Sequence, residues 1–475
     1  MNDRPRAEYV ERFLRNACRD WRTGGGFAIR MARGTASRLL QQHPDIARDS
    51  IYTAIACGDV DTVEQLLAEQ PALASQSGGV HAWPPLLYLA SARIEQRAAA
   101  DNTIAIAQLL LDNGADPNAF YPGGDPSYRY TVLTCVLGMG EELAPTHPRA
   151  PELVSLLFER GAEPYDSQLL YNVFANHASR VRLNDDLVWL LNAIYDQSVQ
   201  LGRANDWNDP EWSMLDVGGH GRGAHYLLEA AVRGKHRRLI NWIRQHGANP
   251  SESSVPAPQG IAVFVDACLQ HDRAAVTAML REHPEYLAAP NALFAATMQD
   301  DVRAAELLLD LGVSPDIANR HDGQRRALHV ASFTGSTRVA ALLIARGADV
   351  DAREMRFGAT PLGVAVWAQQ SGMIALLGAY SRDVFNLSFA GNVARIRFLM
   401  TENPALAENV LPDGQSTLMR LPENEDVALE IVALLLAHGA DPSWLDANGT
   451  TAAEQAFDRA LLRVASVLAG AQRAR

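Results

Sequence analysis

A chain of 475 residues is longer than one hydrophobic core usually serves, so we expect several domains or a linear array of small units. Apolar residues make up 48% and charged residues 20% of the composition, which excludes an intrinsically disordered chain. The formal net charge of −13 disfavours general nucleic-acid binding, and no apolar run reaches the roughly 18 residues of a transmembrane span.

The N-terminal segment predicts one basic amphipathic helix. Residues 7–21 place apolar side chains at helical spacing, and three glycines at 24–26 interrupt the helix. Ten arginines and five acidic residues lie within 1–48, so this end could contact RNA, membrane or an acidic partner, although a solvated capping helix is the simpler interpretation. Because a secretory signal is missing and the four cysteines are single and widely spaced, we expect a cytoplasmic protein.

A repeating unit is predicted from two kinds of helix end. One kind places glycine where a left-handed conformation is needed, and the other stops the helix with proline. The glycine ends are Gly114, Gly161, Gly247, Gly312, Gly347 and Gly439, and the proline ends are Pro44, Pro71, Pro284 and Pro404. With weaker ends near Gln197, Tyr380 and Gly470, they recur about every 36 residues, which predicts an array of helix pairs.

The middle of the chain departs from this spacing. Gly161 and Gly247 are separated by more than two periods, and long polar loops occupy 118–149 and 203–225. Insertions in repeat arrays often lie on the binding side. The predicted parts are a cap helix and glycine hinge at 1–34, repeats with long loops at 35–200, a stretched irregular repeat at 201–260, and further repeats at 261–475.

The most regular stretch is 305–351. Helices predicted at 328–334 and 337–346 are too short to be stable alone, so they must pair and stack on neighbouring units. The runs Ala327 to Ala331, Gly347 to Asp351 and Gly358 to Ala365 resemble the ankyrin repeat, which has a Thr-Pro-Leu-His-x-Ala opening and a period of about 33 residues. The resemblance implies an all-α ankyrin-type α-solenoid, here of about twelve helix-turn-helix units with an N-terminal capping helix.

Patterns for catalysis or cofactor binding are weak. Five possible metal ligands lie in one loop, namely Asp209, Glu211, Asp216, His220 and His225, but their spacing fits no metal-ligand motif. The glycine-rich stretch 218–223 follows no strand, so it is a poor phosphate loop. His329 is more simply a structural hydrogen-bonding residue. We therefore predict no catalytic residue, no metal site and no cofactor.

The resemblance implies that first helices and the turns before them line the inner, concave side of the stack. Tyr, Trp and Arg are the residue types that most often anchor protein contacts. The partner-binding candidates are His81, Trp83, Tyr88, Tyr121, Tyr128, Tyr130, Trp212, His220, Arg222, Tyr226, Arg325, Arg326, Arg356, Phe357 and Trp367. As a group they fit a binding surface and a packed core equally well, with Arg325, Arg326 and Arg356 favouring the surface.

We interpret the chain as a non-catalytic protein–protein interaction scaffold that binds a partner through its concave face and extended loops. The acidic chain favours a partner with a basic surface. One alternative is an enzyme or small-ligand-binding protein whose pocket is formed by loops 118–149 and 203–225, where Tyr121, Tyr128, Trp212 and His220 would converge. Another is an effector or antitoxin-like protein acting on another protein.

Overall fold

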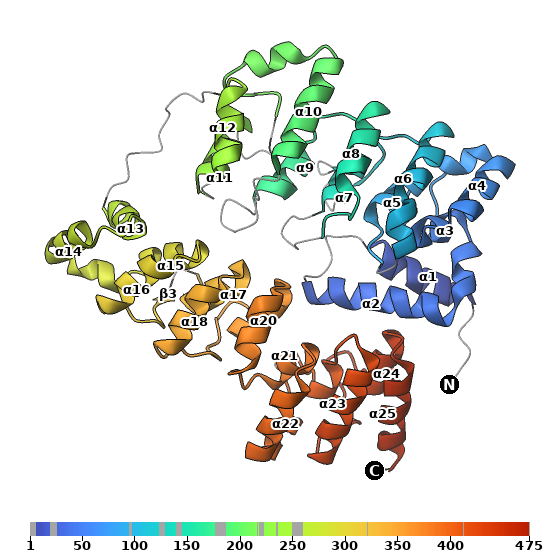
Figure 1. Cartoon of the computed structure of the whole chain (residues 1–475). Helices are drawn as coiled ribbons and strands as arrows, with labels where there is room; N and C mark the ends of the chain where they lie inside the picture. Colours follow the sequence, from blue (N-terminus) through green and yellow to red (C-terminus); the bar gives the residue numbers. More distant parts are fainter. Residues whose placement is uncertain are drawn as a thin grey trace. The chain divides into compact units, whose positions relative to one another are not determined.

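The computed structural model of the chain describes residues 6–19, 26–94, 97–122, 129–138, 145–175, 187–215, 217, 223–233, 236–248, 260–320, 322–411 and 413–474. The chain divides into two compact units, Met1–Ser253 and Ser254–Arg475. In the described parts of both units the regular structure is mostly helical (Figure 1). The strands in these parts are two short antiparallel hairpins, β1 (Phe120–Pro122) with β2 (Arg129–Thr131) and β3 (Ala318–Asn319) with β4 (Arg325–Arg326). The all-α prediction is confirmed.

The first unit is a series of helix pairs. Its α-helices are α1 (Arg6–Ala17), α2 (Gly26–Gln42), α3 (Ile51–Cys57), α4 (Val60–Glu69), α5 (Pro85–Ser91), α6 (Arg97–Asp112), α7 (Val132–Leu137), α8 (Ala150–Glu159), α9 (Ser167–Leu170), α10 (Val188–Gln200), α11 (Gly223–Arg233) and α12 (Arg237–Gln245). The first helices α3, α5 and α7 each contact their own partner and the first helix of the next pair, as α5 does with α6 and α7. Helix α2 runs through the boundary expected at residue 34.

The second unit repeats this arrangement. Its α-helices are α13 (Ile261–Leu269), α14 (Arg273–Glu282), α15 (Asn291–Met298), α16 (Val302–Asp310), α17 (Ala327–Thr334), α18 (Thr337–Ala345), α19 (Pro361–Trp367), α20 (Ser371–Gly378), α21 (Val384–Phe389), α22 (Val393–Glu402), α23 (Glu425–Ala437), α24 (Ala452–Asp458) and α25 (Leu462–Ala474). Helices α17 and α18 confirm the pair predicted at 328–334 and 337–346. The helix end expected near Gly470 is wrong, because α25 continues to Ala474.

Both kinds of predicted helix end are present. The six glycines of the first kind, Gly114, Gly161, Gly247, Gly312, Gly347 and Gly439, have φ between 86° and 99°. At each proline end the α-helix stops two residues before the proline, and a 3₁₀ turn begins at it: η1 (Pro44–Arg48), η2 (Pro71–Ala74), η6 (Pro284–Ala288) and η7 (Pro404–Glu408). Proline suits the first position of such a turn because it has no N–H to donate.

Side chains from neighbouring segments hold the pairs together. Leu343 is fully buried in the core of the second unit. His329 has the structural role expected of it, since its Nδ1 accepts from the Arg326 amide at 3.3 Å and its Nε2 lies 3.1 Å from the Ala359 carbonyl oxygen. The Thr360 hydroxyl donates to Asp383 Oδ2 at 2.6 Å, which links the start of α19 to the start of α21.

Candidate functional site

Five of the predicted binding residues come together in the first unit. His81 and Trp83 lie in the turn before α5, which closes through a bridge between Gly78 and Trp83. The other three residues are Tyr88 on α5, Tyr121 on β1 and Tyr130 on β2, and Tyr121 and Tyr130 are register partners in the hairpin before α7. Two successive turns therefore contribute to one aromatic cluster.

The rings of this cluster stack in sequence from one turn to the next. The centroids of His81 and Trp83 are 4.3 Å apart, those of Trp83 and Tyr121 are 4.4 Å apart, and those of Tyr121 and Tyr130 are 5.2 Å apart, with interplanar angles of 21°, 21° and 13°. The tilted ring of Tyr88 lies 5.7 Å from Trp83. Stacked pairs of this kind contribute roughly 0.5–1.5 kcal/mol beyond area burial, so the two turns stabilise each other.

Hydrogen bonds fix the first turn to α5. The Tyr88 hydroxyl donates to the Gly78 carbonyl oxygen and accepts from the His81 amide, both at 2.9 Å. A Cβ on Gly79, whose φ is +64°, would lie 2.5 Å from the Tyr88 hydroxyl oxygen. Glycine is therefore required here by both conformation and space.

Most of the stack is buried. Trp83, Tyr88 and Tyr121 are buried, so for these three residues the packing alternative holds and they support the turns instead of contacting a partner directly. The surface beside them is formed by Phe120, which is 42% exposed, and Arg129, whose guanidinium carbon lies 4.7 Å from the centroid of the Phe120 ring.

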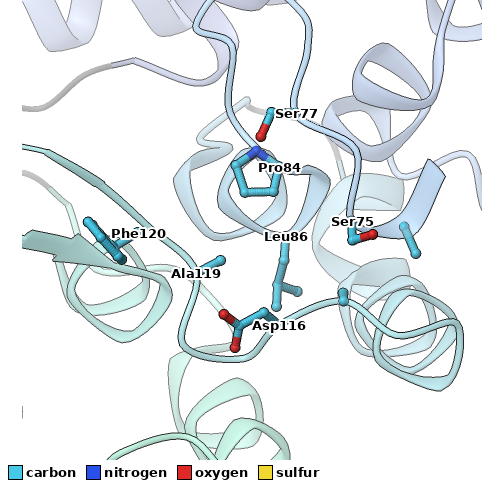
Figure 2. A pocket seen from close by; sticks show the side chains of 9 residues that line it. Ser75, Ser77, Pro84, Leu86, Asp116, Ala119 and Phe120 are labelled. Atoms are coloured by element: carbon cyan, nitrogen blue, oxygen red, sulfur yellow. The ribbon is translucent and has the colours of Figure 1, made fainter. Parts of the chain in front are cut away.

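A pocket of about 280 Å³ opens next to this surface (Figure 2). Its lining combines the small polar side chains of Ser75 and Ser77, the carboxylate of Asp116, and the apolar side chains of Pro84, Leu86 and Phe120, together with Ala74, Ala115 and Ala119. Asp116 Oδ1 accepts from the Asn118 amide at 2.8 Å, which orients the carboxylate. The pocket can therefore accept a hydrogen-bonding or cationic group together with an aliphatic segment.

The tryptophan of the long middle loop lies in a separate core. Trp212 is fully buried, and its ring packs edge-to-face on Trp207 and Trp242 at 4.9 and 6.1 Å. Tyr226 on α11 is half-buried. Tyr128, His220 and Arg222 lie outside the described residues. Because Tyr121 and Trp212 belong to different ring clusters, these two residues do not converge on the pocket that the enzyme alternative requires.

Two of the predicted arginines in the second unit are held by ion pairs. Arg325 lies 3.2 Å from Asp322, and Arg326 lies 3.3 Å from both Asp316 and Asp349. Trp367 is half-buried, with its ring 5.6 Å from that of Phe333. Arg356 and Phe357, in contrast, are exposed in the turn before α19.

The buried ionisable groups have structural partners. Burial lowers the pKa of Arg93 to about 9, and its guanidinium donates to five backbone carbonyl oxygens, those of Ala90, Ala92, Cys135, Val136 and Pro145. Burial raises the pKa of Asp166, which accepts from the hydroxyls of Thr131 and Thr134. In the described parts of the chain no group of three His, Cys, Asp or Glu could hold a metal ion, and no helix there is long and apolar enough to cross a membrane.

Sequence reasoning missed the polar lining of the pocket. Ser75, Ser77 and Asp116 lie in turns and resemble ordinary turn formers, so their residue types gave no signal. Met355 was also missed, although it stands beside the predicted Arg356 and Phe357. A large apolar residue inside a predicted polar turn is a usable signal, since such positions are normally hydrophilic.

Comparison with known proteins identifies the repeats. The family model for ankyrin repeats matches residues 264–354 and 293–388. Among solved structures, an ankyrin repeat domain from Acinetobacter baumannii AYE is 23% identical, with 38% of this chain and 96% of that chain covered and a TM-score of 0.30. The ankyrin repeat domain of Bcl-3, a member of the IkappaB protein family, is 20% identical, with 45% and 99% covered and a TM-score of 0.32. No curated protein matches the chain.

Proposed function

Because this is an ankyrin-repeat protein, we propose that it is a non-catalytic scaffold that binds a partner protein through its turns and first helices. Ankyrin repeats are generally protein–protein interaction modules. The inner, concave side of the array and the turns that project from it form the proposed contact surface. The enzyme and effector alternatives receive no comparable support from the described residues.

The observation that carries this proposal is the stacked aromatic cluster beside the pocket. Stacking of Trp83 on Tyr121 joins two successive turns, and the hydroxyl of Tyr88 fixes the first of them to α5. A surface that is rigid before binding loses little conformational entropy when a partner docks. The exposed ring of Phe120 and the adjoining pocket would then take up side chains of the partner.

The charge of the chain supports a partner with a basic surface. The net charge of −13 attracts such a partner at long range, and the Asp116 carboxylate would meet a lysine or arginine in the pocket. We also propose a cytoplasmic location. The four cysteines are buried and free, as is usual in a reducing compartment.

The test is affinity capture from the native cell with the full chain. Asp116→Lys and Phe120→Ser alter the exposed surface without touching the buried rings. Glu64→Lys, an exposed charge reversal on α4, is the matched control. We expect both surface variants to reduce capture of the wild-type partner at least about tenfold, with a melting temperature like that of the control. Equal capture by all three variants would refute this surface, and no specific partner for the wild type would refute the scaffold function.

A further inference from the structure

The turn between α18 and α19 exposes apolar side chains more than any other described segment. Met355 is 76% exposed and Phe357 is 75% exposed, whereas the next large apolar side chain of the described residues, Leu445, is 54% exposed. Two such exposed side chains in one turn lower the solubility of a protein, so this arrangement is typical of interaction sites.

A buried carboxylate holds this turn in one conformation. Glu354 is only 4% exposed; its Oε1 accepts from the amides of Phe357 and Ala359 at 2.7 and 3.0 Å, and its Oε2 accepts from the amide of Arg356 at 2.8 Å. The Met355 amide donates to the Gly323 carbonyl oxygen at 2.6 Å, which joins the turn to the preceding hairpin. The two apolar side chains are thus presented on a backbone that is already ordered.

Two arginines, Arg353 and Arg356, lie in the same turn as the apolar pair. The Arg356 guanidinium carbon lies 5.1 Å from the centroid of the Phe357 ring, and the Arg353 guanidinium donates to the Gly358 carbonyl oxygen at 2.7 Å. Within the described part of the chain neither arginine has a carboxylate at salt-bridge distance, in contrast to Arg325 and Arg326. Two guanidinium groups without a salt bridge, beside an apolar pair, are complemented by carboxylates around an apolar recess on the other surface.

We propose that Met355 and Phe357 insert into an apolar pocket of the partner protein whose rim carries Asp or Glu side chains. This inference rests on the proposed scaffold function and adds a local requirement opposite in sign to the long-range charge of the chain. An anionic membrane would also accept arginines and apolar side chains, but the net charge of −13 opposes approach to such a surface.

The experiment places a photo-crosslinking benzoylphenylalanine at position 357 of the full chain in its native cell. The control places it at Phe398 on α22, which is 48% exposed and has the Arg395 guanidinium 5.0 Å from its ring centroid. We expect position 357 to crosslink to a partner segment that contains apolar residues and at least two carboxylates. Crosslinks to a basic segment, or none above the control, would overturn the inference.

Binding to the crosslinked partner gives the second readout. The double variant Met355→Ser with Phe357→Ser should raise the dissociation constant about 30-fold, whereas Phe398→Ser should raise it less than about twofold. Arg353→Gln with Arg356→Gln should slow association about tenfold at low salt, with the difference lost at high salt. An unchanged dissociation constant for the Met355 and Phe357 variant would overturn the inference. If Phe120→Ser still reduced capture at least about tenfold, the proposed scaffold function would stand without this inference.

A separate experiment distinguishes a lipid membrane from a partner protein as the target of Met355 and Phe357. Wild type and the Met355 and Phe357 variant are sedimented with vesicles of phosphatidylserine and phosphatidylcholine. We expect neither to sediment above the level seen with phosphatidylcholine alone. Sedimentation of the wild type that the double substitution removes would overturn the protein pocket in favour of a membrane.

Discussion

Acid should destabilise the first unit through His147. This side chain is 5% exposed, and its Nδ1 accepts from the Arg149 amide at 3.1 Å, so protonation would place a hydrogen on the atom that accepts one. Burial, and then the nearby charges of Arg93 and Arg149, lower its pKa from 6.5 to about 3. Between these two values the unfolded chain binds a proton that the folded chain does not.

The direction and the magnitude of the change in stability follow from this difference in proton binding. A group whose folded pKa is lowered stabilises the fold fully above the pKa of the unfolded chain, and this stability is lost as the pH falls from 6.5 toward about 3. At about 1.4 kcal/mol per pH unit, going from pH 7 to pH 5 should cost about 2 kcal/mol.

Hydrogen exchange resolved by peptide measures this loss within the first unit. We expect α7 and α8, which flank His147, to lose about 2 kcal/mol of protection between pH 7 and pH 5, after correction for the pH dependence of intrinsic exchange. In His147→Asn the side-chain oxygen can still accept from the backbone amide of Arg149 but does not titrate. The variant should therefore lose about 2 kcal/mol less protection than the wild type. The same loss in wild type and variant would refute the reasoning.

Two further predictions concern the second unit. Leu343→Ala should lower the free energy of unfolding by about 2–5 kcal/mol in chemical denaturation, because the fully buried side chain leaves a cavity; a loss below about 1 kcal/mol would contradict this packing. Arg326→Glu should lower the melting temperature more than Arg356→Glu, because Arg326 lies between Asp316 and Asp349 whereas Arg356 has no ion pair among the described residues. Equal shifts would show that the ion pairs of Arg326 do not stabilise the fold.

Helix ends were readable from the sequence because they depend on residue type. Glycine at Gly312 or Gly347 is the residue that accepts a positive φ without strain, and the structure has a positive φ at both positions. Gly470 was wrongly predicted as a helix end, because α25 continues through it to Ala474. A glycine alone lowers helix stability by roughly 1 kcal/mol but does not terminate a helix whose face is packed.

Burial of individual aromatic residues could not be read in the same way. A large ring serves a core and a contact surface equally well, so Trp212 and Phe357 looked alike in the sequence although one is buried and the other exposed. Ion pairs of Arg326 were also hidden, because Asp349 is 23 positions further along the chain and approaches only through stacking of the units. The burial of a ring and the ion pairs of Arg326 both depend on how neighbouring units stack on each other.

The guanidinium of Arg93 limits how this array can evolve. Repeat proteins usually gain or lose whole units, because each unit contacts only its neighbours through similar surfaces. Here one side chain binds carbonyl oxygens at the end of α5, at the end of α7 and at Pro145. Excision or duplication of a unit between these points would leave a buried cation or its acceptors without partners, so we expect α5, α7 and Pro145 to be retained together.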